Sequence, residues 1–121
     1  MKYKLPFQIA ELARQKTGLA IPINFVFGGD DLFPQYRDLG MTDGVDIILS
    51  RKMINLPLDN QVAVIAHEIA HLIMMQSGIL HTENEADSLA SWLIGKKIWY
   101  DEYDIQTTRN TGKIRPHYLG Q

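Results

Sequence analysis

Apolar residues recur at helical spacing in three parts of the chain: residues 6–17, 61–76 and 83–99. Repetition every three or four positions is typical of amphipathic helices, so we predict a helix over each segment. Gly95 is expected to interrupt the last helix only mildly. The apolar residues on which these predictions depend are Ile9, Leu12 and Ala13 in the first segment, Val62, Ile65, Ile69, Leu72 and Ile73 in the second, and Ala86, Leu89, Ala90, Leu93 and Ile94 in the third.

Residues suited to helix ends flank these segments. Pro6 fits the first turn of a helix and Gly18 fits its end. Asp59 or Asn60 is expected to cap a helix that begins at Gln61, because a short polar side chain can accept from the unpaired amides of the first turn. Gly78 should end the same helix.

Two segments have the composition of strands. Residues 21–27 (IPINFVF) are rich in β-branched and aromatic residues, and residues 45–50 (VDIILS) alternate weakly. The stretch between them, residues 28–44, is dense in Gly, Asp and Pro and is predicted to be a loop. We therefore expect an α+β fold in which a small sheet packs on the helix over residues 61–76, with the helix from Glu83 crossing below.

Length and composition limit the classes of protein to consider. The chain has 121 residues, 45% of them hydrophobic, which suits one domain over residues 1–121, with residues 101–121 as an irregular end. The net charge of -2 predicts neither nucleic-acid nor membrane binding. The N-terminus does not resemble a signal peptide, and a soluble, cytoplasmic protein is expected. Composition leaves the oligomeric state open.

An HExxH motif, His67-Glu68-Ile69-Ala70-His71, stands inside the predicted central helix. Histidines four residues apart lie on one face of a helix, so both imidazoles can reach one ion. The chain contains no cysteine, so histidine and carboxylate are the ligands it can offer to zinc. Chance occurrence is the alternative, but a mostly apolar helix rarely carries His67 and Glu68 unless they are paired or bind metal.

A zinc site of this kind needs a third protein ligand, for which Glu83 is the first choice and Glu85 and His81 are alternatives. Glu83 and Asp87 share a helix face, and Asp87 is placed to orient a ligand histidine by hydrogen bonding. An open fourth position on the zinc would hold water and lower its pKa to about 7. Glu68 would act as the general base on this water.

The motif and the segment Glu83-Asn84-Glu85-Ala86-Asp87-Ser88-Leu89-Ala90 resemble the ImmA/IrrE family of gluzincin-like metallopeptidases over residues 45–95. The resemblance implies a compact, minimal zincin-like domain, with Glu83 as the third zinc ligand. It also implies a regulatory endopeptidase that cleaves a protein such as a helix-turn-helix repressor. The chain departs from the family pattern in having Leu89 in place of phenylalanine, no proline near Gly95, and a short loop between the helices.

Several other positions remain candidates for a role in hydrolysis. An oxyanion-stabilising donor is needed, and residues 45–50 could form a sheet edge that aligns an extended substrate. His81 could be a fourth ligand but is expected to face solvent. The basic end around Lys113 and Arg115 could fold over the site and keep it latent. The candidate donors are Tyr100, Tyr103, His117 and Tyr118.

Three classes of function follow from these observations. The first is a zinc-dependent endopeptidase acting on a protein or peptide. The second is a zinc-stabilised binding module without turnover, although structural zinc sites are usually closed by four protein ligands. The third, a DNA-binding regulator, is disfavoured because the chain carries no basic surplus and no evident recognition-helix module.

Overall fold

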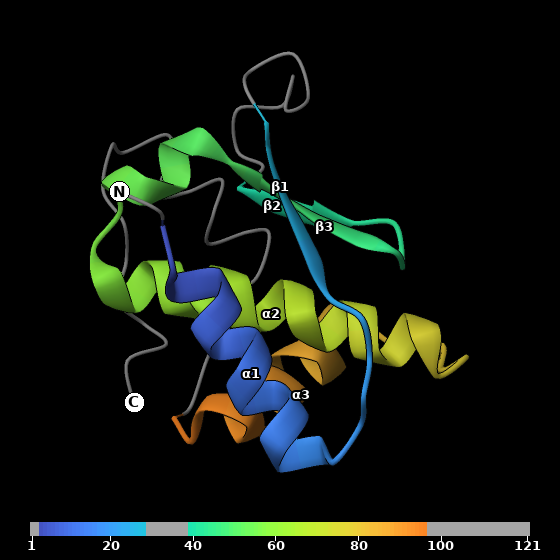
Figure 1. Cartoon of the computed structure of the whole chain (residues 1–121). Helices are drawn as coiled ribbons and strands as arrows, with labels where there is room; N and C mark the ends of the chain where they lie inside the picture. Colours follow the sequence, from blue (N-terminus) through green and yellow to red (C-terminus); the bar gives the residue numbers. More distant parts are fainter. Residues whose placement is uncertain (1–2, 29–38, 97–121) are drawn as a thin grey trace.

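The computed structural model describes residues 3–28 and 39–96 of the chain. Within these ranges, helices and a small mixed sheet form an α+β fold (Figure 1), which confirms the predicted fold class. The sheet packs on one side of the HExxH helix, and two further helices pack on its other sides. In chain order the elements are α1 (Leu5–Thr17), β1 (Asn24–Gly28), β2 (Gly40–Thr42), β3 (Asp46–Ser50), a 3-10 helix (Arg51–Asn55), α2 (Leu58–Gln76) and α3 (Glu83–Ile94).

The sheet has the order β1-β3-β2, with β3 parallel to β1 and antiparallel to β2. The prediction that residues 45–50 form a sheet edge is therefore wrong, because β3 is paired on both sides. The predicted loop over residues 28–44 is also wrong at its end, where β2 forms. Three residues are too few to show a period of two, so pairing with β3 decides this strand and local sequence does not.

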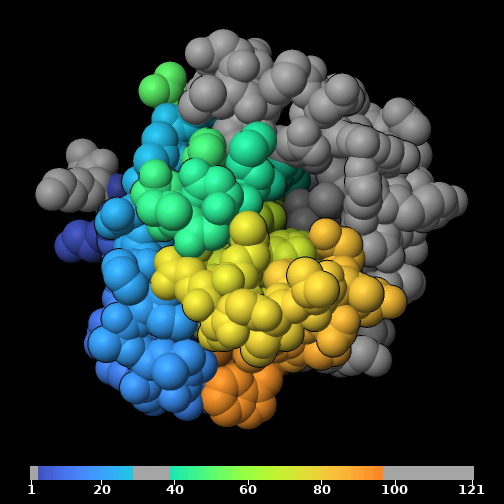
Figure 2. Space-filling model, turned by 90° about the vertical axis from the view of Figure 1, so that its right-hand side faces the viewer, coloured from blue at the N-terminus to red at the C-terminus, as the bar shows by residue number. Residues whose placement is uncertain are grey.

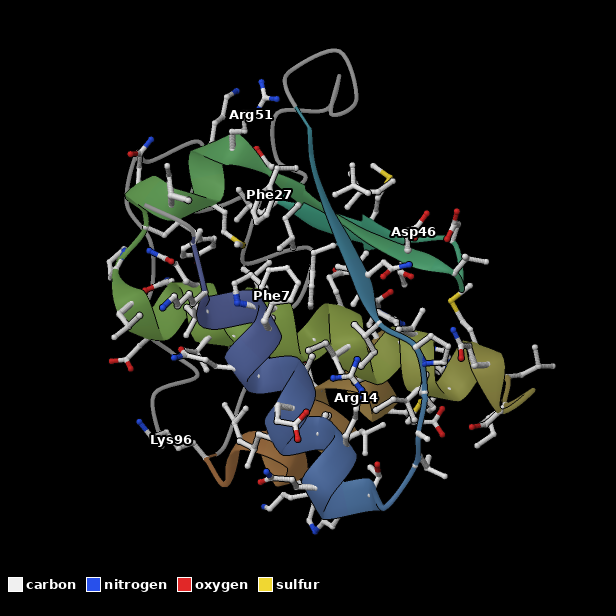
Figure 3. All side chains as sticks on the ribbon, in the orientation of Figure 1. Phe7, Arg14, Phe27, Asp46, Arg51 and Lys96 are labelled. Atoms are coloured by element: carbon white, nitrogen blue, oxygen red, sulfur yellow. The ribbon has the colours of Figure 1, made fainter. Side chains whose placement is uncertain are left out.

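The first strand begins later than its composition suggests. Residues 21–27 were expected to be extended, whereas β1 covers Asn24–Gly28. Pro22 has no backbone N–H for a sheet ladder, so the strand starts beyond it. The backbone carbonyl of Ile21 accepts instead from the guanidinium of Arg14 at 3.2 Å. Figure 3 shows the Arg14 side chain on α1.

The first helix agrees with its prediction to within one residue. It covers Leu5–Thr17 and ends at Gly18, which has the left-handed φ of 70° that glycine adopts without strain. Leu12 lies at the margin of the buried face and is 37% exposed. Lys16 connects α1 to α3, because its ammonium donates to the carbonyl of Trp92 at 2.6 Å and lies 5.1 Å from the Trp92 ring centre.

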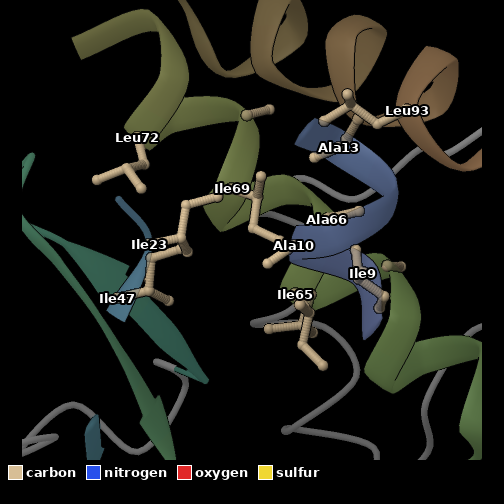
Figure 4. Packing of buried hydrophobic residues seen from close by; sticks show 14 of the residues in the cluster. Ile9, Ala10, Ala13, Ile23, Ile47, Ile65, Ala66, Ile69, Leu72 and Leu93 are labelled. Carbon is tan, nitrogen blue, oxygen red and sulfur yellow. The ribbon is translucent and has the colours of Figure 1, made fainter. Parts of the chain in front are cut away.

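The core forms around α2 (Figure 4). Ile65, Ile69 and Leu72 of α2 are fully buried in one cluster with Ile47 and Leu49 of β3. Replacing one such side chain by alanine typically costs about 2–5 kcal/mol. The helices also carry buried small side chains that let them approach closely. These are Ala10 and Ala13 in α1, Ala63, Ala66 and Ala70 in α2, and Ala86 and Ala90 in α3.

The HExxH helix begins three residues earlier than predicted. It starts at Leu58, and Pro57 occupies the N-cap position without a side-chain cap. Asp59 therefore lies in the first turn, where its charge suits the helix dipole, and Asn60 is buried. The expectation that Asp59 or Asn60 caps a helix starting at Gln61 is wrong, because the proline already sets the boundary.

The helix that carries Glu83 is capped at both ends. The Thr82 hydroxyl accepts from the Glu85 amide and the Glu85 carboxylate accepts from the Thr82 amide, which is a capping box. The helix ends at Ile94, since Gly95 adopts a left-handed φ of 72°. The predicted continuation through Gly95 toward residue 99 is therefore wrong: this glycine ends the helix rather than interrupting it mildly.

Candidate metal centre

The two motif histidines lie one turn apart on α2, as their spacing predicts. Their Nε2 atoms are 3.0 Å apart, and their rings meet edge to face with centroids separated by 4.5 Å. The side chains are largely buried, with 6% of His67 and 16% of His71 exposed. A helix held on several sides by the core therefore fixes both rings toward a common point.

Glu83 completes a group of three donor atoms. Its Oε1 lies 2.8 Å from Nε2 of His67 and 2.9 Å from Nε2 of His71. The short connection between α2 and α3 brings Glu83, the first residue of α3, back to the histidines. Glu85, an alternative third ligand, is instead held in the capping box with Thr82. The structure thus places Glu83 rather than Glu85 at the histidines.

The donor atoms fit a metal ion with little rearrangement. A tetrahedral zinc ion with bonds of about 2.0 Å would keep its donors about 3.3 Å apart. The three donors lie 2.8 to 3.0 Å apart, so an opening of roughly 0.4 Å would admit the ion. His67, His71 and Glu83 thus form a group that could hold a metal ion, although their geometry does not select zinc over other borderline metals.

Asp87 supports the group from the second turn of α3. Its Oδ1 lies 2.7 Å from Nδ1 of His67, and both side chains are buried. A carboxylate there accepts the Nδ1 hydrogen and leaves Nε2 of His67 free to bind a metal. This contact agrees with the role predicted for Asp87, that of orienting a ligand histidine.

The site has an electrostatic preference for a positive charge. Burial lowers the pKa of His67, but hydrogen bonds to Asp87 and Glu83 and the nearby charge of Glu68 outweigh burial and raise this pKa from 6.5 to about 10. Without a metal, a proton on His67 therefore supplies the positive charge. Burial and the charge on His67 lower the pKa of His71, which stays neutral at pH 7.

The carboxylate of Glu83 is held ionised by the same contacts. Its hydrogen bond with His67 is the largest cause and, together with the nearby His71 ring, outweighs partial burial and lowers its pKa from 4.5 to about 2. Because 60% of the Glu83 side chain is exposed, solvent screening weakens the energetic effect of these contacts. The group nevertheless offers an anionic oxygen and a neutral His71 ring to an ion at neutral pH.

Glu68 lies beside the metal group, next to the edge strand β2. Its side chain is buried, with 8% of the residue exposed. A Cβ atom added at Gly40 would come within 3.0 Å of Cγ and 3.5 Å of Cδ of Glu68. The absence of a side chain at Gly40 therefore gives Glu68 the room that it occupies.

His81 does not take either of the positions expected for it. Its Nε2 lies 2.6 Å from Nδ1 of His71, the nitrogen turned away from the donor group, and its own Nδ1 lies 3.0 Å from the carbonyl oxygen of Ile79. It therefore neither joins the group as a ligand nor simply faces solvent. Sequence reasoning missed this contact, although the place of His81 two residues before Glu83 was a signal that it lies nearby.

Gly40 was also missed, because it falls in a segment without periodicity. The remaining candidates from the sequence lie outside the described residues: the irregular end over residues 101–121, with its latent-state hypothesis, and the possible oxyanion donors. Those donors are Tyr100, Tyr103, His117 and Tyr118.

In the parts of the chain that the structure describes, no helix is both long enough and apolar enough to cross a membrane. Comparisons with protein-family models, with curated proteins and with solved structures found no match to this chain. The case for a function therefore depends on the geometry of the His67, His71 and Glu83 group and on the chemistry of the residues around it.

Proposed function

We propose that the protein is a zinc-dependent endopeptidase in which His67, His71 and Glu83 hold the metal and Glu68 is the general base. The observation that carries the proposal is the convergence of two imidazole nitrogens and one carboxylate oxygen within 3.0 Å, next to Glu68. Two histidines and a carboxylate leave a zinc ion one open position, which is typical of catalytic rather than structural sites. The resemblance of residues 45–95 to ImmA/IrrE peptidases supports the same function.

The chemistry divides between the metal and Glu68. When bound, zinc would lower the pKa of water to about 7 and polarise the substrate carbonyl. Glu68 would take a proton from the attacking water and deliver it to the amine as the C–N bond breaks. One water molecule is consumed, and the products are a carboxylate and an amine.

Strand β2 supports a binding mode for an extended peptide. Within residues 3–28 and 39–96, β2 pairs with β3 alone, and the side of Gly40 on which a Cβ atom would lie faces the Glu68 side chain. A peptide that added to the other edge of β2 would pass the general base with its backbone hydrogen-bonded. The substrate-aligning edge that we expected at residues 45–50 is therefore assigned to β2. A regulatory substrate such as a repressor is supported only by the family resemblance.

Metal content and hydrolysis test the proposal together. Elemental analysis should find one zinc ion per chain in the wild type and none in His67→Ala or Glu83→Ala. Glu68→Gln should retain zinc and lose at least about a hundredfold in cleavage of a proteome-derived peptide library read by mass spectrometry. A wild-type protein that binds no zinc would refute the site, and cleavage unaffected by Glu68→Gln would refute the mechanism.

A zinc-stabilised binding module without turnover is the second candidate. It is favoured by the fact that the donor atoms come from two helices, so that an ion would cross-link α2 to α3 whether or not hydrolysis occurs. This function predicts that zinc raises the melting temperature of wild type and Glu68→Gln equally and that neither protein cleaves peptides. The proposed enzyme would show the same rise in melting temperature with zinc, but its wild type would cleave peptides.

A further inference from the structure

A chain of hydrogen bonds runs from the turn after α2 to the outer nitrogen of His71. Nδ1 of His71 lies 2.6 Å from Nε2 of His81, and Nδ1 of His81 lies 3.0 Å from the carbonyl oxygen of Ile79. The two rings are tilted, with centroids 4.8 Å apart. The other ring nitrogen of His71 faces His67 and Glu83, so the chain approaches the metal group from behind.

The direction of each hydrogen bond follows from the last acceptor. A carbonyl oxygen can only accept, so Nδ1 of His81 donates to Ile79. In a neutral His81 ring Nε2 is then the acceptor, and Nδ1 of His71 donates to it. His71 is left with a lone pair on Nε2, the atom that faces the donor group. The chain thus selects the tautomer of His71 that can bind a metal through Nε2.

The turn that holds His81 is tied to the end of α2. The amide of Ile79 donates to the carbonyl of Met74 at 2.9 Å, and the amide of Gly78 donates to Met75 at 3.1 Å. Figure 2 shows the end of α2 and the following turn, in yellow, at the surface between the strands in green and α3 in orange. Because His81 precedes Glu83 by two residues, one short turn supplies both an orienting group and a ligand.

We propose that His81 is a positioning residue of the metal centre, which accepts a hydrogen bond from His71 and thereby fixes the tautomer and the ring orientation of this ligand. The inference rests on the metal site proposed above. Loss of a group that orients a ligand histidine typically lowers metal affinity 10- to 100-fold. His81 should therefore affect zinc affinity without contacting the ion.

Two substitutions separate hydrogen bonding from packing. His81→Phe keeps a ring of similar size but removes the acceptor, and it should weaken zinc binding by about tenfold or more in a chelator competition assay. His81→Gln returns an acceptor oxygen and should recover most of this loss. Thr82→Ala is the matched control, because it breaks the capping box in the same turn without touching His71. A loss in Thr82→Ala as large as in His81→Phe would overturn the inference.

The second measurement needs no metal. Nitrogen-15 chemical shifts of the His71 ring in the metal-free protein should report the Nδ1–H tautomer in the wild type and a mixture with Nε2–H in His81→Phe. The same tautomer in both proteins would overturn the inference, as would equal zinc affinity. Zinc binding without peptide cleavage would refute the proposed enzyme alone. A wild type that binds no zinc would refute the metal site, while the shifts would still decide whether His81 sets the tautomer.

Discussion

The two histidines of the HExxH motif have equivalent places in the sequence pattern but different surroundings in the fold. His67 is nearly buried and donates from Nδ1 to the buried carboxylate of Asp87 at 2.7 Å. His71 is more exposed and is paired at Nδ1 with the His81 ring, which belongs to a surface turn. One histidine is thus held by a buried carboxylate inside the protein, and the other by a second imidazole ring in a surface turn.

Because their contacts differ, the two histidines should contribute differently to the stability of the metal-free protein, although both are needed to bind the metal. The contacts of His67 connect α2 to the buried face of α3, so they contribute to the fold even when no metal is bound. The outer contact of His71 reaches only the turn between the two helices. We therefore expect both histidines to be needed for the metal, but only His67 to be important for the stability of the metal-free protein.

The largest effect is expected from His67→Ala in the presence of a chelator. This substitution removes the histidine that lies 2.7 Å from the buried carboxylate of Asp87, and breaking a buried pair in this way costs about 3 kcal/mol of unfolding free energy. His71→Ala, the matched control, should cost about 1 kcal/mol, as an average substitution does. Urea unfolding followed by circular dichroism measures both, and equal losses would remove the distinction between the histidines.

Asp87→Asn should weaken zinc binding by about 10- to 100-fold while keeping an acceptor oxygen near Nδ1 of His67. The reason is that the carboxylate charge makes His67 a stronger donor to the metal than an amide would. Chelator competition gives the affinity, with His81→Gln as the comparison on the other histidine. A smaller loss of zinc affinity in Asp87→Asn than in His81→Gln would contradict the expectation that Asp87 supports His67 more strongly than His81 supports His71.

Zinc affinity should rise by about tenfold per pH unit between pH 7 and 9, because His67, with a pKa of about 10, must lose its proton to bind the metal. The stability of the metal-free protein should change in the opposite direction. Because the pKa of His67 is higher in the folded state than its unfolded value of 6.5, protonated His67 stabilises the folded protein. This contribution to the free energy of unfolding is fully present below pH 6.5 and is lost as the pH rises toward 10. Calorimetry in buffers of different protonation enthalpy should count about one proton released per zinc. Zinc affinity that does not change with pH would contradict the assignment of a proton to His67 in the metal-free protein.

The smallest effect is expected at the strand beside Glu68. Gly40→Ala would place a methyl group 3.0 Å from Cγ of Glu68, so the general base must shift by a few tenths of an ångström. We expect kcat to fall by about tenfold, since small displacements of catalytic groups are costly, with zinc affinity unchanged. Val26→Ala, in β1 at the opposite edge of the sheet, is the control and should keep the wild-type kcat. An unaffected kcat in Gly40→Ala would show that Glu68 does not depend on this contact.

Local patterns predicted the parts of the fold and the site that depend on helical periodicity. The spacing of His67 and His71 on one helix face and the start of the next helix at Glu83 follow from rules that act within a few residues. The choice of Glu83 over Glu85 also agrees with the structure, because Glu85 is used by the capping box. These predictions needed no knowledge of how the elements pack.

The parts that sequence reasoning missed depend on contacts between distant segments. Strand β2 forms because β3 offers a pairing edge, and Gly40 matters only because that strand crosses Glu68. The contact between His81 and His71 depends on the path of the turn, which tertiary hydrogen bonds determine. Periodicity and propensity contain no information about such approaches, so the surroundings of the ligands could not be read from the motif.

The proposed metal centre requires one ion among three side chains from α2 and α3. Anomalous diffraction at the zinc edge, from crystals of the zinc-loaded protein, would locate this ion. A single peak is expected about 2.0–2.2 Å from Nε2 of His67, Nε2 of His71 and a carboxylate oxygen of Glu83. No peak there, or a peak bound through Nδ1 of either histidine, would contradict the proposed metal centre.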